Sequence, residues 1–386
     1  MNFTLHSKDL LARLAITVPI IQAPMAGWAT PALAAAVSNA GAMGSLGIGG
    51  MKAEAGRAVI QKTRSLTERP FNVNVFCHKR PAADSVKEAR WLEFLHPHFA
   101  QFQAVPPAAL HDAMSSFVED DAVLAMLIEE RPAVVSFHFG LPGPEAIAAL
   151  HDAGIVLFAT ATNADEASRV ADAQIDAIVA QGAQAGGHRG AFDPAVRDEL
   201  LGTATLVQVL RRETSLPIIA AGGIMDGAGI AAVLALGAQA AQLGTAFLVT
   251  PESAADSADR AALLDPRSRT AFTKAISGRL ARGIESAYMD LERDPDCPPI
   301  PDFPIAFDAA RALNAAAKAY GGSGNSGSPG SSAFAARWAG EAVRLSRAMP
   351  AAALVATLAQ ETIDAISSVW TGFIACSEPD TSGPDT

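Results

Sequence analysis

Short apolar runs alternate along this chain with longer stretches in which apolar and polar positions recur with a helical period. The short runs contain many β-branched residues, which is typical of buried strands, and the longer stretches are typical of amphipathic helices. Strands are expected at Ile20–Ala23, Met43–Leu46, Phe71–Val75, Val134–Phe139, Val156–Ala159, Ala177–Ala180, Ile218–Ala221 and Ala241–Leu243. Helical segments are expected after them, at Pro31–Asn39, Ala53–Leu66, Ala82–Glu130, Pro144–Asp152, Asp165–Ala173, Thr205–Arg212, Ala228–Leu236 and Ala254–Leu264.

This run of strand–helix units predicts an α/β protein whose parallel sheet closes into a (β/α)8 TIM barrel. An open, doubly wound sheet is the alternative. The segment Cys77–Arg131 is too long for one crossover, so an inserted segment after strand 3, at about 78–131, is expected near the strand ends. We therefore expect a barrel at 1–270, a helical C-terminal extension on the substrate side at 271–376, and a disordered acidic tail at 377–386.

The C-terminal extension shows its own periodicity. Helices are expected at Asp308–Tyr320, Arg337–Ser346 and Ala351–Trp370. The Gly/Ser-rich stretch Gly321–Ser332 lies between the first two and is expected to be a mobile surface loop.

The composition then narrows the class of protein. Half of the 386 residues are hydrophobic and only 18% are charged, which excludes a disordered chain. The net charge of −11, without any run of Lys or Arg, offers no electrostatic footprint for nucleic acid. The 3 cysteines are far apart and form no Cys-x-x-Cys pair, so we expect a reducing compartment without disulfides or structural zinc.

Three segments bear on targeting and metals. Residues 1–9 contain no basic stretch followed by an apolar run, as a secretory signal would. Glycines and glutamines interrupt Ala231–Val249, so a helix followed by a strand explains this apolar segment better than a membrane span. His96 and His98 lack a third ligand at metal-binding spacing. We expect a cytoplasmic protein with no metal and no membrane contact.

The residues directly after each strand are the candidates for chemistry, because barrels bind ligands where their strands end. His138 ends strand four; a histidine in an apolar strand is often a hydrogen-bonded core residue, but its place at the strand end favours function. Asn72 and Asn74 share one side of strand three and need partners, which a heteroaromatic ligand or the core would supply. Gln181 ends strand six and offers both a donor and an acceptor.

The loops after strands six, seven and eight are rich in glycine. The glycines in the loop after strand six, including Gly186 and Gly187, allow the backbone to approach a ligand; the alternative is a flexible loop with an exposed basic pair, His188-Arg189. Strands seven and eight leave through Gly222-Gly223 and Gly244-Thr245. In many barrels these two loops bind phosphate through backbone N–H groups, so a phosphate-bearing cofactor or substrate is expected.

Together, these turns resemble the nitronate monooxygenases, formerly called 2-nitropropane dioxygenases. The resemblance covers about Ile20 to Gln360, and the Ser-Phe-His-Phe-Gly sequence around His138 is its most specific part. Its motifs are Ile20–Gly27, Val134–Leu141, Ala180–Gly190, Pro217–Ile224 and Ala241–Thr245, with Ser277–Arg279 and Trp338–Gly340 outside the barrel strands.

The resemblance implies an FMN-dependent enzyme that oxidises alkyl nitronates with O2 to a carbonyl compound and nitrite. It gives His138 the catalytic role, either as the base that removes the α-proton of a nitroalkane or as the group that orients an ionised nitronate. Lys318 and Tyr320 fall near a region that contributes polar groups to the substrate pocket of some relatives. The implied FMN contacts are Pro24, Met25, Ala26, Asn74, Gln181, Gly186, Gly187, Gly222, Gly223, Gln242, Leu243, Gly244 and Thr245.

Three other functions remain open. A flavin-dependent NAD(P)H:quinone reductase or enoyl-thioester reductase of the same superfamily would use the same barrel, although the Phe-His-Phe setting of His138 argues against it. A flavin-free barrel could isomerise or cleave a sugar phosphate, and a flavin-binding protein could lack turnover. The expected partners are O2 and a small-molecule nitronate, with propionate-3-nitronate as one candidate. The protein is expected to be a monomer or a homodimer.

Overall fold

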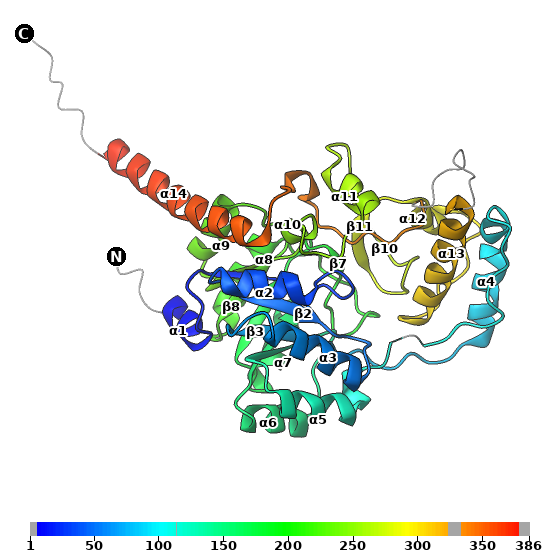
Figure 1. The fold of residues 1–386 in the computed structure, drawn as a ribbon, viewed down its shortest axis with the longest axis horizontal. Helices are drawn as coiled ribbons and strands as arrows, with labels where there is room; N and C mark the ends of the chain where they lie inside the picture. Colours follow the sequence, from blue (N-terminus) through cyan, green and yellow to red (C-terminus); the bar gives the residue numbers. More distant parts are fainter. Residues whose placement is uncertain (1–5, 113, 323–332, 378–386) are drawn as a thin grey trace, which may run out of the picture.

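The structure is a computed structural model that describes residues 6–112, 114–322 and 333–377. Its centre is a sheet of eight parallel strands in the order β1-β9-β8-β6-β5-β4-β3-β2 (Figure 1). A parallel bridge between Ile21 and Met43 joins the two ends of this order, so the sheet closes into a barrel. The strands are β1 (Ile20–Gln22), β2 (Gly44–Gly47), β3 (Phe71–Phe76), β4 (Val134–His138), β5 (Val156–Ala161), β6 (Ala177–Gln181), β8 (Ile218–Ala221) and β9 (Ala240–Leu243). Every expected barrel strand is present, which confirms the TIM barrel and excludes the open sheet.

Four of the helices around the barrel begin at side chains that cap them. Thr30 accepts a hydrogen bond from the N–H of Leu33, and Pro31 follows as the first residue of the helix. Asn163 and Asp226 cap two later helices in the same way. The helices of the ring are α2 (Pro31–Asn39), α3 (Ala53–Arg64), α5 (Asp121–Glu130), α6 (Pro144–Asp152), α7 (Ala164–Asp172), α8 (Thr203–Glu213) and α9 (Gly227–Ala235).

Helix α1 (His6–Arg13) closes the end of the barrel at which the strands begin. Leu10 and Leu14 share a buried cluster with strand residues such as Ile21 and Phe158. Because this end is filled with apolar side chains, only the opposite end of the barrel is available for a ligand.

The inserted segment after β3 divides into two parts. Its second helix, α5, packs against α3 and α6 and so belongs to the ring. Its first helix, α4 (Ser85–Ala100), packs instead against α13 (Ile305–Gly322), and Figure 1 shows this pair at one side of the barrel. Trp91 and Phe99 of α4 share a buried cluster with Leu313 of α13. We call this pair, α4 and α13, the second lobe.

The region expected to be helical beyond residue 271 begins with strands, which corrects the sequence prediction. β10 (Thr270–Thr273), β11 (Ala281–Ile284) and β7 (Gly187–His188) form a small antiparallel sheet. These strands are too short to give a detectable period.

The helix expected at Arg337–Ser346 is also wrong. Trp338 pairs with Gly283 beside β11, and the N–H of Ile284 donates to the carbonyl of Arg337. This backbone is therefore committed to the small sheet, and only the 3-10 turn η3 (Val343–Leu345) is helical. Shorter elements between β9 and the C-terminal helix are α10 (Thr245–Leu248), α11 (Ser257–Leu264), α12 (Ala287–Asp290) and the 3-10 turn η2 (Leu291–Arg293).

The C-terminal helix α14 (Ala351–Ser377) packs against both α9 and α2. Leu354 and Leu358 belong to the main barrel core, so the first half of α14 occupies the ring position between the seventh and first helices. The Gly/Ser loop (323–332) and the tail (378–386) lie outside the described residues. Within the part that the structure describes, no helix is long and apolar enough to cross a membrane.

Candidate active site

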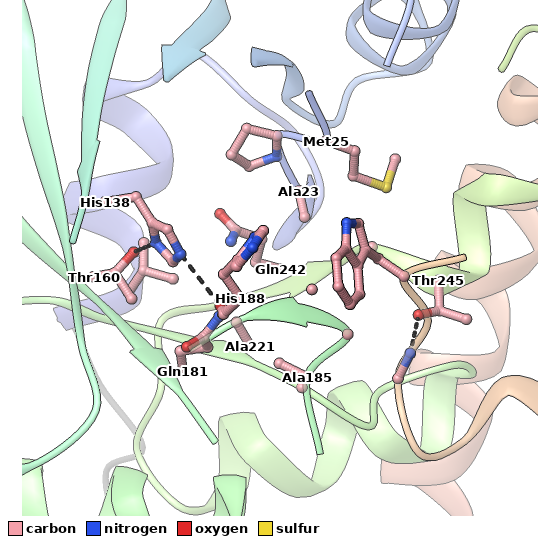
Figure 2. A pocket seen from close by; sticks show the side chains of 18 of the residues that line it. Ala23, Met25, His138, Thr160, Gln181, Ala185, His188, Ala221, Gln242 and Thr245 are labelled. Atoms are coloured by element: carbon pink, nitrogen blue, oxygen red, sulfur yellow. Dashed lines mark hydrogen bonds between the residues drawn. The ribbon is translucent and has the colours of Figure 1, made fainter. Parts of the chain in front are cut away.

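One cavity at the carboxyl ends of the barrel strands contains most of the predicted site. Its volume is about 250 Å³. Figure 2 shows His138 and Thr160 on one side of it and Thr245 on the other, with Gln242 between them. The predicted residues that line it are Pro24, Met25, Ala26, Asn74, His138, Gln181, Gly186, Gly187, Gly222, Gly223, Gln242, Gly244 and Thr245.

Leu243 is the predicted contact that does not line the cavity. Successive side chains of a strand point to opposite faces, so Leu243 points away from the side that its neighbour Gln242 faces. Its side chain is buried in the main core, and its carbonyl accepts a hydrogen bond from the N–H of Ala23 at 2.8 Å. Leu243 therefore fixes the turn after β1 against β9.

The imidazole of His138 is held by two groups. Nδ1 lies 2.9 Å from Oγ1 of Thr160, at the end of β5, and Nε2 lies 3.3 Å from the carbonyl oxygen of His188. A carbonyl can only accept, so Nε2 carries the proton and the Thr160 hydroxyl donates to Nδ1. Both ring nitrogens are therefore satisfied when the imidazole is neutral.

The surroundings of His138 favour this neutral form strongly. Burial, followed by the positive charge of Arg279, lowers the pKa of His138 to about 3. The same two causes lower the pKa of His188 to about 3. At neutral pH neither ring contributes a positive charge to the cavity.

His188 and Arg189 are not the exposed basic pair of the alternative interpretation. His188 lines the cavity from β7, and its Nε2 lies 2.9 Å from Oγ of Ser277. Arg189 is buried and pairs with Asp198 at 2.7 Å. The loop after β6 is therefore a fixed wall of the site.

The amide side chains differ in what they leave for a ligand. Asn72 donates to Oγ of Ser45 and does not line the cavity, so its side chain belongs to the core, where its oxygen has no partner among the described residues. Asn74 lines the cavity and donates to Ser136. Gln181 is largely committed, because its oxygen accepts from the N–H of Gly190 at 2.7 Å and its nitrogen donates to the carbonyl of His188.

The opposite side of the cavity contains backbone and small residues beside larger side chains such as Trp338. Gly222 and Gly223 have φ of +119° and +73°, which other residues rarely adopt. A Cβ on Gly186 would lie 2.5 Å from the backbone of Gly340, so only glycine allows this close approach. The N–H of Gly340 donates to Oγ1 of Thr245 at 2.8 Å, which ties the Trp-Ala-Gly segment to the end of β9 (Figure 2).

Phe139 forms a strained wall next to His138. Its φ of +74° lies in the left-handed region, which is costly for an aromatic residue and recurs at functional sites. The ring centres of Phe139 and His138 are 4.4 Å apart. Arg279 lies over the face of the Phe139 ring, with its Cζ 4.1 Å from the centre of that ring.

The family profile described as "Nitronate monooxygenase" matches residues 8–361 of this chain. The chain belongs to the nitronate monooxygenase family. It is 56% identical over 355 residues to the "Nitronate monooxygenase" of Paraburkholderia phytofirmans, covering 92% of this chain and 94% of that protein. The protein of the same name from Pseudomonas aeruginosa is 51% identical over 349 residues, covering 90% of this chain and 97% of that protein. A solved structure of a nitroalkane oxidase from Streptomyces ansochromogenes superimposes with a TM-score of 0.81 at 38% identity, covering 93% of this chain and 99% of that one.

Nitronate monooxygenases are flavin-dependent oxidoreductases that act as monooxygenases. Membership of this family argues against the alternative function of a flavin-free isomerase or lyase. Among the described residues that line the cavity, none is Asp, Glu, Lys or Arg. Elsewhere in the described chain, no group of three or more His, Cys, Asp or Glu is placed to hold a metal ion.

Sequence reasoning missed several residues that line this cavity or lie next to it. Thr160 follows the rule that strand ends carry chemistry and could have been found by it. Ser277 and Arg279 belong to a noted motif, but nothing local showed that they face the histidines. Met114 and Phe307 enter the cavity from the inserted segment and from α13, where no sequence signal marked them.

The weaker sequence candidates lie elsewhere. Lys318 is exposed on α13. Tyr320, also on α13, packs against Phe102, which follows α4, with 6.0 Å between their ring centres. Neither lines the cavity.

Proposed function

We propose that this chain binds flavin mononucleotide in the cavity and oxidises alkyl nitronates with O2 to a carbonyl compound and nitrite. One observation supports this proposal above all. A single cavity at the strand ends contains His138 and a wall of small residues, and its lining is uncharged. An anionic substrate would meet no carboxylate there among the described lining residues.

The lining fits a flavin by its own chemistry. Ala23, Pro24 and Ala26 form a low wall on which a flat ring can lie. The side-chain amide of Gln242 forms no hydrogen bond with any described residue. Its donors and its acceptor are therefore left for a heteroaromatic ring. A Cβ on Gly187 would meet no atom within 4 Å, so a side chain there would enter open space.

The phosphate of the flavin would be held by backbone N–H groups at Gly223, Gly244 and Thr245. A charge-neutral cradle of this kind binds phosphate without the Lys or Arg side chains that the lining lacks. When bound, the flavin supplies the electron transfer between nitronate and O2.

The hydrogen bonds of His138 favour one of its two predicted roles. A base with a pKa of about 3 holds a proton too weakly to remove the α-proton of a neutral nitroalkane efficiently at neutral pH. Its Nε2–H, only loosely held by the carbonyl of His188 at 3.3 Å, is available to orient a nitro group that is already ionised. Ionised nitronates are therefore the preferred substrates in this proposal, and neutral nitroalkanes are poor ones.

The test is an O2-electrode and nitrite assay on protein whose released flavin has been identified by mass. We expect FMN, and rapid O2 uptake with propionate-3-nitronate and ethylnitronate, with slower uptake from nitroethane. A yellow protein without O2 uptake from any nitronate would overturn the proposal. Anaerobic bleaching of the flavin by NADH, with turnover of a quinone, would support the reductase instead.

A further inference from the structure

Arg279 is a buried cation that no described carboxylate contacts directly. Its side chain is 4% exposed, its Nε donates to the carbonyl of Arg189 at 3.4 Å, and its Nη2 donates to the carbonyl of Ala191. No ion pair joins Arg279 to a carboxylate among the described residues. Burying a charge in this way is costly, and carbonyls with an aromatic face offset the cost only in part.

The nearby carboxylates are committed to other groups. Glu166 and Asp193 both act on Arg279 at a distance. Glu166 accepts hydrogen bonds from Thr162 and from the N–H of Phe192, and Asp193 accepts from the N–H of Ala195. Arg189, in contrast, is neutralised by direct contact with Asp198.

The turn that carries Arg279 is built to direct it inward. Gly278 has a φ of +82°, and a Cβ there would lie 2.2 Å from the carbonyl oxygen of Pro301. Ser277, on the other side of this glycine, bonds both His188 and the carbonyl of Arg279. The guanidinium therefore stacks on the ring of Phe139, with Cζ of Arg279 4.1 Å from the ring centre.

Phe139 separates this charge from the cavity. Its ring centre lies 4.4 Å from that of His138, 5.8 Å from that of His188 and 6.3 Å from that of His78. Arg279 is the second cause, after burial, of the lowered pKa of each of these histidines. The charged and titratable groups that face it are thus these three rings, Arg189 and the two distant carboxylates.

We propose that Arg279, acting through the face of Phe139, determines the charge preference of the site and favours an anionic nitronate over the neutral nitroalkane. The inference rests on the proposed function and deepens it by assigning the substrate charge to a residue. Arg279 does not line the cavity and acts through Phe139, so it is a positioning residue. A charge about two side chains away, screened little by water, stabilises an anion but leaves a neutral molecule almost unaffected.

The matched control is Arg282. Its Cζ also lies 4.1 Å from the centre of a phenylalanine ring, Phe272, and its Nε donates to the carbonyl of Ala183 at 3.0 Å. It does not line the cavity, and Phe272 makes no ring contact with the histidines in the described structure. Replacing Arg282 therefore shows how much activity is lost when any arginine stacked on a phenylalanine is removed.

The kinetic test compares ethylnitronate with freshly diluted nitroethane at pH 7.5 for wild type, R279M, R279K and R282M, at equal flavin content. We expect R279M to lower kcat/KM for ethylnitronate about tenfold and for nitroethane less than threefold. R279K, which keeps the charge, should keep the preference within about threefold. Equal losses with both substrates, the same selective loss in R282M, or a lost preference in R279K would overturn the inference.

A second readout requires no turnover. Nitrate is a planar anion like a nitronate, and calorimetry should show that R279M binds it about tenfold more weakly than wild type, while R282M does not. Carbon-13 NMR of the histidine rings should show the pKa values of His138 and His188 rising by about one unit in R279M only. If the wild-type protein oxidises no nitronate, the proposed function fails, whereas unchanged nitrate binding and unchanged titrations in R279M would reject the role of Arg279 itself.

Discussion

The two sides of the cavity are built on different principles. On the histidine side, His138, Thr160 and His188 come from β4, β5 and β7, and they depend on Arg279 from a turn far along the chain. On the glycine side, consecutive turns after β8 and β9 supply backbone and small side chains. The histidine side controls charge and proton position through long-range contacts, whereas the glycine side controls shape through local backbone geometry.

The largest effect should come from removing the imidazole on the histidine side. H138N should retain its flavin but lose about 100-fold or more of its turnover of ethylnitronate, the ionised substrate that Nε2–H would orient, and less of its already slow turnover of nitroethane. The O2 electrode measures both rates. His151, which pairs with Asp176 away from the cavity, provides the control H151N. Near-normal rates with ethylnitronate in H138N would contradict the orienting role of His138.

The glycine side should respond in flavin binding rather than in chemistry. Gly223 has a φ of +73°, and a Cβ there would lie 3.0 Å from Cβ of Gln184. G223A should therefore bind flavin about tenfold more weakly and unfold with a free energy lower by about 1 kcal/mol. Flavin fluorescence and urea unfolding measure these two quantities.

The control for this change is Gly143 at the start of α6, where a Cβ would meet no atom within 4 Å and φ is −63°. G143A should leave flavin affinity unchanged. Equal flavin affinity in G223A and G143A would show that the glycine side does not depend on its backbone conformation.

A smaller effect should follow from the hydroxyl that orients the imidazole. T160V removes the group 2.9 Å from Nδ1 of His138, and one lost hydrogen bond corresponds to about a fivefold fall in kcat with ethylnitronate. T160S keeps the hydroxyl and should recover most of the rate. If T160S is as slow as T160V, packing of the Thr160 methyl group matters and the hydrogen bond does not.

Acid should also reduce stability through the two buried histidines. The pKa values of His138 and His188 fall from 6.5 to about 3 in the folded protein, so the unfolded chain binds more protons between these values. Their contribution is fully present above about pH 6.5 and is lost as the pH falls, by roughly 1 kcal/mol per pH unit for each ring. Urea unfolding at pH 7.5 and pH 5.5 should show this loss, and H138N should reduce it. A steeper acid loss in H138N would contradict this prediction.

The same contrast explains what the sequence could predict. The barrel strands and the glycine side follow from local patterns: strand–helix alternation, and glycines such as Gly223 directly after a strand. His138 was found because it ends a strand. Arg279, Met114 and Phe307 could not be placed, because they reach the cavity through packing between distant segments.

Secondary structure shows the same limit. The small sheet of β7, β10 and β11 was missed because two- to four-residue strands carry no period and depend on partners elsewhere in the chain. The ring position of α14 could not be read either, since amphipathicity marks a helix but not the surface on which it packs.

The position of α14 has a consequence for biosynthesis. The helix that fills the gap between α9 and α2 is separated from β9 by residues 244–350, so the ring cannot close until nearly the whole chain has left the ribosome. At about 5–20 residues per second, α2 waits roughly 15–60 s for this neighbour. During that interval, the apolar surface that Leu354 and Leu358 later cover stays open to chaperones and to other nascent chains.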